Sequence, residues 1–142
     1  MNLEEDLREF IELLNALDVR YILVGAHVVA YHGYPRFTGD IDLFVEMSEE
    51  NAERILNVIK RFGFEGLGLD FLKEDQVVQL GVDPNRIDLM TFLSGVDFQE
   101  AWATREQAEI DGLKMPIISK EMLKRNKAAS GRIQDLADLE QL

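Results

Sequence analysis

The 142-residue sequence has no cysteine, only three prolines and no long apolar run. The absence of cysteine excludes disulfides, thiol nucleophiles and zinc sites built on cysteine. No segment approaches the roughly 18 consecutive apolar residues of a membrane-spanning helix, and the N-terminus lacks a basic region followed by an apolar run. We therefore expect a soluble, cytoplasmic protein.

Positive charge is also scarce, because 15 Lys and Arg residues face 27 Asp and Glu residues, for a net charge of −12. Such a chain does not attract nucleic acid or anionic membranes in general, so a polyanion would need a local basic patch. Residues 113–132 form one, with six Lys and Arg residues against one Glu, a charge of +5. Basic residues on a helix often serve only solubility, but this stretch is also where a triphosphate or a tRNA-like acceptor would dock.

The length and the 46% apolar content predict one folded domain over residues 1–142. Apolar spacing and turn residues predict an α/β (α+β) fold, in which helices flank a mixed β-sheet. The predicted helices cover residues 3–17, 26–31, 48–62, 98–104, 119–127 and 133–142, and the predicted strands cover residues 20–24, 40–45, 77–82, 86–92, 108–110 and 113–118. Ser48 and Gly63 have the residue types that begin and end a helix.

Asp40 and Asp42 are two residues apart on a predicted strand, so both carboxylates lie on one face. Paired carboxylates suit Mg²⁺ or Mn²⁺, although a D-x-D motif alone is more typical of a solvated strand face. Gly25 follows another strand and opens a helix, where backbone N–H groups would receive a phosphate. Asp88, on a third strand, would join the pair if the strands are neighbours, and is otherwise a surface carboxylate near a turn. Together these are the parts of a site for phosphoryl or nucleotidyl transfer.

Residues 21–45, with their strand, small-residue pair, helix and D-x-D strand, resemble the polymerase-β-type nucleotidyltransferase superfamily. More narrowly, G-x-H followed by HGYPR-x-T-x-DID is similar to small nucleotidyltransferase-like proteins related to the AbiEii-type abortive-infection toxins. The C-terminal pattern of that group also matches, at Lys127, Gly131-Arg132 and residues 135–139. The resemblance implies a nucleotidyltransferase-like core and covers nearly the whole chain.

The resemblance implies that Asp40 and Asp42 bind the metal ions that carry a nucleoside triphosphate, with Asp88 completing the metal site. Asp88 would also help to remove the proton from the acceptor hydroxyl. The backbones of Gly25 and Ala26 would contact phosphate oxygens.

Four further residues are candidates for phosphate or acceptor contacts. Arg36 and Thr38 precede the D-x-D motif, where they would contact phosphate or brace the loop. Lys127 and Arg132 would contact the triphosphate or the acceptor.

The resemblance predicts a metal-dependent nucleotidyltransferase that moves NMP from an NTP to a hydroxyl on a protein, an RNA end or a small molecule, releasing pyrophosphate. Ala26 stands where the superfamily usually has Gly or Ser, and the helical domain of many relatives is missing, so a partner protein or a homodimer would supply that surface. The alternative is a catalytically weak nucleotide-binding or interaction protein, part of a toxin–antitoxin or abortive-infection pair.

Two other features carry less functional weight. His27 and His32 have no partners at metal-ligand spacing, so packing or exposure is favoured over a zinc site. Trp102, with Phe98, is interpreted as anchoring the core rather than as a platform for stacking a base.

Overall fold

The computed structural model describes residues 5–25, 28, 41–63, 77–81, 86–110 and 112–142. These residues form one six-stranded sheet and five helices. The strands are β1 (Tyr21–Val24), β2 (Ile41–Val45), β3 (Val77–Leu80), β4 (Ile87–Met90), β5 (Glu106–Ile110) and β6 (Leu113–Ile117). The helices are α1 (Glu5–Ala16), α3 (Glu49–Phe62), α4 (Phe98–Ala103), α5 (Lys120–Ser130) and α6 (Ile133–Gln141).

The sheet has the strand order β3-β4-β2-β1-β6-β5 and contains both parallel and antiparallel pairs. The central strands β1 and β2 are antiparallel, whereas β2 pairs with β4 and β1 pairs with β6 in parallel. The outer pairs β3–β4 and β5–β6 are antiparallel. The sequence prediction of a mixed sheet flanked by helices is therefore confirmed.

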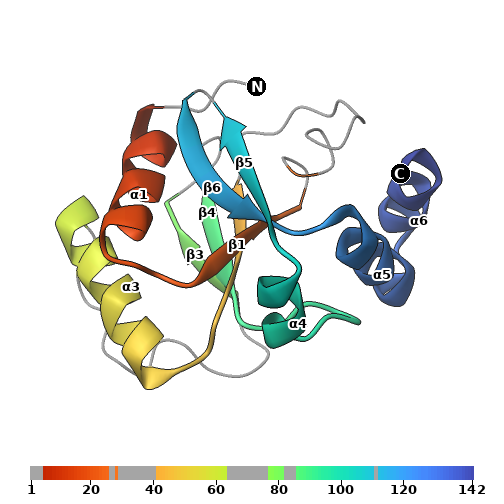
Figure 1. The fold of residues 1–142 in the computed structure, drawn as a ribbon, viewed down its shortest axis with the longest axis horizontal. Helices are drawn as coiled ribbons and strands as arrows, with labels where there is room; N and C mark the ends of the chain where they lie inside the picture. The colour runs from red at the N-terminus through yellow and green to blue at the C-terminus, as the bar shows by residue number, and fades with distance from the viewer. Residues whose placement is uncertain (1–4, 26–27, 29–40, 64–76, 82–85, 111) are drawn as a thin grey trace.

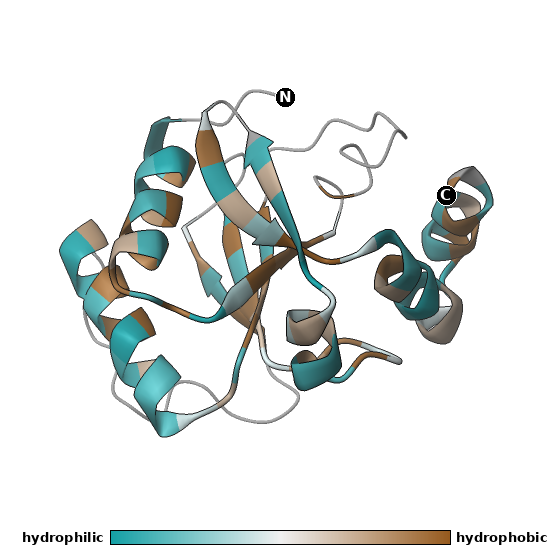
Figure 2. Cartoon of the chain, viewed as in Figure 1, coloured by the Kyte–Doolittle hydropathy of each residue, from teal (hydrophilic) through white to brown (hydrophobic). Residues whose placement is uncertain are grey.

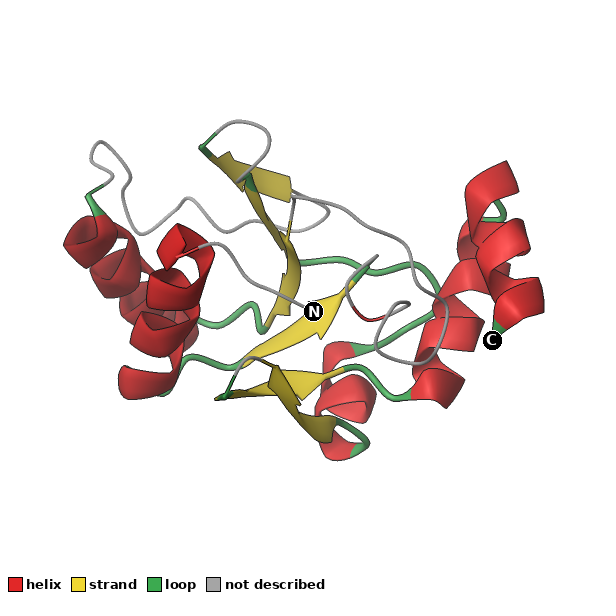
Figure 3. Cartoon of the chain, turned by 90° about the horizontal axis from the view of Figure 1, so that it is seen from above, coloured by secondary structure: helices red, strands yellow, loops and turns green. Residues whose placement is uncertain are grey.

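Helices lie on both sides of the sheet. Helices α1 and α3 pack together on one side, and α4, α5 and α6 lie on the other (Figures 1 and 3). The helices carry both hydrophilic and hydrophobic residues, while the central strands are mostly hydrophobic (Figure 2). This is the separation expected when amphipathic helices bury their apolar faces against a sheet.

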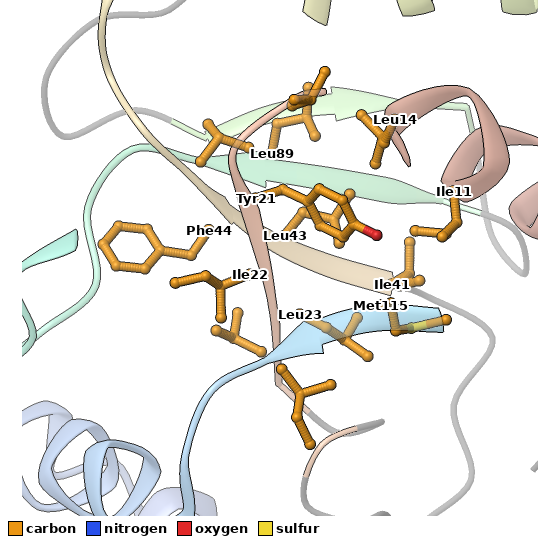
Figure 4. Close-up of a cluster of buried hydrophobic side chains, with 14 of the residues drawn as sticks. Ile11, Leu14, Tyr21, Ile22, Leu23, Ile41, Leu43, Phe44, Leu89 and Met115 are labelled. Atoms are coloured by element: carbon orange, nitrogen blue, oxygen red, sulfur yellow. The ribbon is translucent and has the colours of Figure 1, made fainter. Parts of the chain in front are cut away.

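The core is centred on strands β1 and β2. Every residue of β1 is buried, and in β2 only Asp42 is not fully buried. Side chains from β4, β6 and α1 fill the space around them (Figure 4). Tyr21 is buried within this cluster and donates a hydrogen bond to Asn15 Oδ1 at 2.7 Å. Burial raises the pKa of its phenol, and the hydrogen bond with Asn15 only partly opposes this shift.

Helix caps confirm several of the predicted boundaries. Ser48 accepts a hydrogen bond from the backbone N–H of Asn51 at the start of α3, and Gly63 ends the helix in the left-handed conformation at φ 108°. Gly131 ends α5 in the same way at φ 65°. Helix α5 runs three residues past its predicted end at Lys127, because the capping glycine, rather than the last apolar residue, terminates it.

Some predicted elements differ from the structure or fall outside it. Strand β5 begins at Glu106 instead of residue 108, because pairing with β6 extends it over exposed residues that the apolar pattern did not mark. The predicted helix over 26–31, apart from residue 28, and the turn at residues 83–85 lie outside the described residues. Among the residues that the structure describes, no helix is both long and apolar enough to cross a bilayer.

Candidate active site at the end of strands β1 and β2

Two of the predicted carboxylates meet across neighbouring parallel strands. Asp42 on β2 is the register partner of Asp88 on β4. Residues at the same register of adjacent strands point to the same face of a sheet, about 5 Å apart. The condition set by the sequence, that the two strands be neighbours, is therefore met.

Asp88 is buried, which overturns its interpretation as a surface carboxylate near a turn. It is 6% exposed and accepts two hydrogen bonds from Arg86, at 2.9 Å from Nε and 3.1 Å from Nη2. The planar guanidinium matches both carboxylate oxygens, an arrangement that fixes geometry as well as charge. Sequence reasoning did not single out Arg86, although its i, i+2 spacing to Asp88 on a strand was a readable signal.

Gly25 lies directly against the carboxylate of Asp42. Its φ of 78° is in the left-handed region, and a Cβ atom placed there would lie 2.2 Å from Asp42 Oδ2. Only glycine satisfies both the backbone conformation and the close approach. The strand pairing brings this about, because Val24, which precedes Gly25, is the register partner of Asp42.

Helices α5 and α6 are joined by a buried ion-pair cluster. Lys127, 5% exposed, places Nζ 3.1 Å from Asp135 Oδ1 and 3.3 Å from Asp138 Oδ2. Asp138 also accepts a hydrogen bond from Gln134 at 2.8 Å. Paired charges of opposite sign make the burial of such groups tolerable.

Arg132 is the exposed cation of this cluster. Its Nε lies 2.6 Å from Asp135 Oδ2, while its side chain remains 80% exposed. The hydrogen bond and the charge of Asp135 raise the pKa of the Arg132 guanidinium, burial opposes them slightly, and the charge of Asp42 adds to the rise. Arg132 therefore lies within electrostatic range of Asp42.

Asp135 is the centre of the cluster. Burial alone would raise the pKa of its carboxyl, but hydrogen bonds from Arg132, Ser130 and Lys127 and the charge of Lys127 lower the pKa to about 2. The sequence placed Lys127 and Arg132 in the basic stretch, and their spacing to the acidic residues of α6 was visible. Their pairing with Asp135 and Asp138 was not predicted.

The loop that carries α4 holds α5 in place. Asn126 donates a hydrogen bond to the carbonyl oxygen of Ser94 at 3.0 Å. Gly95, with φ 73°, lies so close to α5 that a Cβ atom there would be 2.6 Å from the Cβ of Ala129. These contacts fix the helix that bears Lys127.

Four predicted site residues lie outside the described residues, namely Ala26, Arg36, Thr38 and Asp40, together with the two histidines. Their roles stay predictions. Within the described parts of the chain, no group of three or more His, Asp or Glu side chains gathers as a metal site. A third carboxylate beside Asp42 and Asp88 would have to come from outside those parts, and Asp40 directly precedes β2.

Trp102 and Phe98 pack as the sequence suggested. Their rings stack with centroids 5.8 Å apart, and Phe98 meets Phe44 edge to face at 5.2 Å. Both residues pack against the core, so they anchor α4 on the sheet.

Comparison with a solved structure supports the fold. The chain resembles a Thermotoga maritima protein whose crystal structure is described as that of a "putative nucleotidyltransferase". The two are 21% identical, with a TM-score of 0.64 over 95% of this chain and 88% of that one. At this identity the likeness concerns the fold alone. No curated protein matches the chain.

The family comparison covers almost the whole sequence. Residues 3–142 match the family described as nucleotidyl transferase of unknown function (DUF2204). The match includes the glycine turn, the D-x-D strand, Asp88 and the C-terminal Lys–Arg–Asp pattern. With these residues in a nucleotidyltransferase-like fold, the chain belongs to this nucleotidyl transferase family.

Proposed function

We propose that the protein is a metal-dependent nucleotidyltransferase that transfers NMP from an NTP to a hydroxyl acceptor and releases pyrophosphate. The observation that carries the proposal is the register pairing of Asp42 with Asp88 beside Gly25. Membership of a nucleotidyl transferase family supports it.

The donor set fits a magnesium or manganese ion. Asp42 and Asp88 offer carboxylate oxygens from adjacent strands, and hard oxygen ligands are those that Mg²⁺ prefers. Asp40, one residue before β2, would add a third carboxylate. A bound metal ion would neutralise charge on the triphosphate and stabilise the charge that develops during transfer.

The chain's own residues would orient the two reactants. Gly25 brings its backbone, with no side chain in the way, to within contact of the Asp42 carboxylate. The N–H groups of Gly25 and Ala26 would hold phosphate oxygens at this turn.

The reaction balances without a further reagent. The acceptor oxygen forms a bond to the α-phosphorus as the bond from that phosphorus to the bridging oxygen of the β-phosphate breaks, so pyrophosphate leaves. The carboxylate of Asp88 would take the proton of the hydroxyl.

Arg132 is our candidate for contact with the triphosphate. Its side chain is exposed, and the charge of Asp42 makes a small contribution to the raised pKa of its guanidinium. Lys127 would act through Asp135, which it holds in place for Arg132. Arg36 and Thr38 would brace the loop before the D-x-D strand or contact phosphate.

Thermal denaturation with each of the four NTPs, with and without Mg²⁺ or Mn²⁺, tests the nucleotide site. We expect a metal-dependent rise in Tm with at least one NTP, because a ligand that binds only the folded state stabilises it. The rise should vanish in Asp42→Asn and Asp88→Asn. Glu53→Gln, which removes one exposed carboxylate from α3, is the matched control and should keep the rise.

Release of pyrophosphate from the stabilising NTP tests the transfer itself. Candidate acceptors are the protein itself, RNA ends and small hydroxyl compounds. A rise in Tm that survives in both variants, or one that needs no metal ion, would contradict the proposed site.

A second candidate function is a nucleotide-binding partner protein related to the AbiEii-type toxins, within a toxin–antitoxin or abortive-infection pair. Helix α6 favours it, because Ile133 is 90% exposed and Leu136 is 47% exposed. Ala26, which lacks a hydroxyl, also favours weak catalysis. Nucleotide binding without pyrophosphate release for any acceptor would select this function, and sedimentation would then measure a homodimer or a complex with a partner chain.

A further inference from the structure

A cavity of about 540 Å³ opens at the far end of β1 from Gly25. Tyr21, the first residue of β1, lines it, whereas Gly25 follows the last. Four residues of extended chain separate the two ends by about 13 Å. Neither Asp42 nor Asp88 lines this cavity, so it is distinct from the carboxylate site.

Four cationic side chains line the cavity against one carboxylate. Arg20 directly precedes β1, Arg54 lies on α3, Arg105 directly precedes β5 and Lys114 lies on β6, while Asp18 is the carboxylate. In a chain with a net charge of −12, this is a local concentration of positive charge. Concave basic surfaces attract anions more strongly than flat ones do.

Three of these cations form no ion pair with a carboxylate of the described residues. Arg20 pairs with Glu46 at 3.3 Å. Within the described residues, Arg54, Arg105 and Lys114 form no ion pair, although Glu109 is the cross-strand neighbour of Lys114. Their charges are therefore available to a ligand.

The walls of the cavity are tied together by hydrogen bonds. Asn15 accepts a hydrogen bond from Tyr21 and donates one to the carbonyl oxygen of Lys114 at 2.8 Å, which joins α1, β1 and β6. Asp18 adopts a left-handed φ of 55°, and its carbonyl oxygen accepts a hydrogen bond from Arg54 at 3.4 Å. Such bonds position the cationic groups before a ligand arrives.

The ring of Trp102, which lines the cavity, is covered by the guanidinium groups of two arginines. Arg105 Cζ lies 3.8 Å and Arg20 Cζ lies 5.5 Å from the ring of Trp102, while Phe98 stacks against the same ring. Arg105 is also held by a hydrogen bond to the carbonyl oxygen of Trp102 at 2.6 Å. The occupied ring disfavours stacking of a base and favours recognition of a charged group.

We propose that this cavity binds a small ligand that carries two or more phosphate groups. Guanidinium groups match the oxygens of phosphate, and Arg54, Arg105 and Lys114 would surround a chain of phosphates. The volume falls within the roughly 300–1,000 Å³ of small-molecule sites. The cavity is thus a second anion site, independent of the proposed nucleotidyl transfer.

Fluorescence of the single tryptophan tests the proposal, because Trp102 itself lines the cavity. The full chain is titrated with tripolyphosphate in EDTA, without divalent metal, so that metal-assisted binding at the carboxylate site does not contribute. We expect a saturable change in emission. Arg54→Gln and Lys114→Gln should each weaken binding by about tenfold, since each removes a charged partner of the phosphate chain.

Arg61→Gln is the matched control, because it removes an exposed arginine further along α3. It should bind tripolyphosphate as the parent does, and Asp42→Asn should do the same. Arg54, Lys114 and Arg61 are all exposed, so a Tm close to that of the parent will confirm that each variant folds.

Titrations with pyrophosphate and ADP distinguish an inorganic from a nucleotide source of the phosphates. The compound that binds more tightly identifies the source, and either result supports the site. No saturable change, or equal weakening by Arg61→Gln, would overturn the proposal. Citrate that binds as tightly as tripolyphosphate would overturn the assignment to phosphate.

Discussion

Gly25 and Asp42 occupy adjoining space at the end of the two central strands, where a Cβ atom on Gly25 would lie 2.2 Å from Asp42 Oδ2. The contact couples the glycine turn to the carboxylate site. Each residue therefore limits the size of the side chain that the other position can hold.

Gly25→Ala should destabilise the protein by about 1 to 3 kcal/mol, through the strained left-handed backbone together with the contact. In an Asp42→Ala background the cost should be smaller, because the carboxylate is gone and only the backbone strain remains. Urea unfolding of the two single variants and the double variant measures the free-energy cost of the backbone strain and that of the contact. Equal costs in the two backgrounds would show that the contact carries no energy.

Arg86→Gln should increase the stabilisation by Mg²⁺ or Mn²⁺ that the proposed function predicts. Both oxygens of Asp88 bind Arg86, so a metal ion would have to share them with the guanidinium. Without metal, the variant should have a lower Tm than the parent because a buried carboxylate loses its partner. The slope of Tm against metal concentration tests this prediction, with Arg61→Gln as the control. A slope no steeper than that of the parent would contradict competition between the metal ion and Arg86 for Asp88.

Asp135 should make stability depend on acid pH. Its pKa is lowered from 3.8 to about 2 in the folded protein, so its stabilising contribution is complete above the unfolded value and declines as the pH falls from about 5 toward 2. The side chain is 3% exposed, and the shift corresponds to about 2 kcal/mol. The free energy of unfolding, measured with urea between about pH 6 and about pH 3, should fall more steeply with decreasing pH for the parent than for Asp135→Asn. Parallel curves would contradict the assignment.

Substitutions of Lys127 and Arg132 should have different effects, because Lys127 is a structural residue and Arg132 is our candidate for contact with the ligand. Lys127→Met removes the buried cation that Asp135 and Asp138 share and should cost about 3 kcal/mol or more of stability, although Asp135 keeps its contact with Arg132. Arg132→Gln removes an 80% exposed partner and should cost under about 1 kcal/mol.

Arg132 should matter for nucleotide binding, although its substitution costs little stability. Arg132→Gln should weaken the binding of the stabilising NTP by roughly tenfold, while its Tm without nucleotide stays near that of the parent. Lys124→Gln, an exposed lysine on α5, is the control for loss of one positive charge from the basic stretch. Unchanged NTP affinity in Arg132→Gln would remove this residue from the proposed site.

The sequence by itself determined the local parts of this protein. Helix limits at Ser48 and Gly63, and the period of two around Asp42, depend on capping and side-chain geometry within a few residues. Local rules of this kind also supported the glycine turn at Gly25 and the resemblance that pointed to a nucleotidyl transferase family.

Only the tertiary structure decided which of those parts meet. The parallel pairing of β2 with β4 brings Asp88 to Asp42, and the packing of α6 on α5 pairs Lys127 with Asp135 and Asp138. The cavity lined by Arg54 and by Lys114, and by residues of α1, β1, α4 and β5, follows no spacing in the chain. Such contacts depend on strand order and helix docking, which are set by burial of the whole core rather than by neighbouring residues.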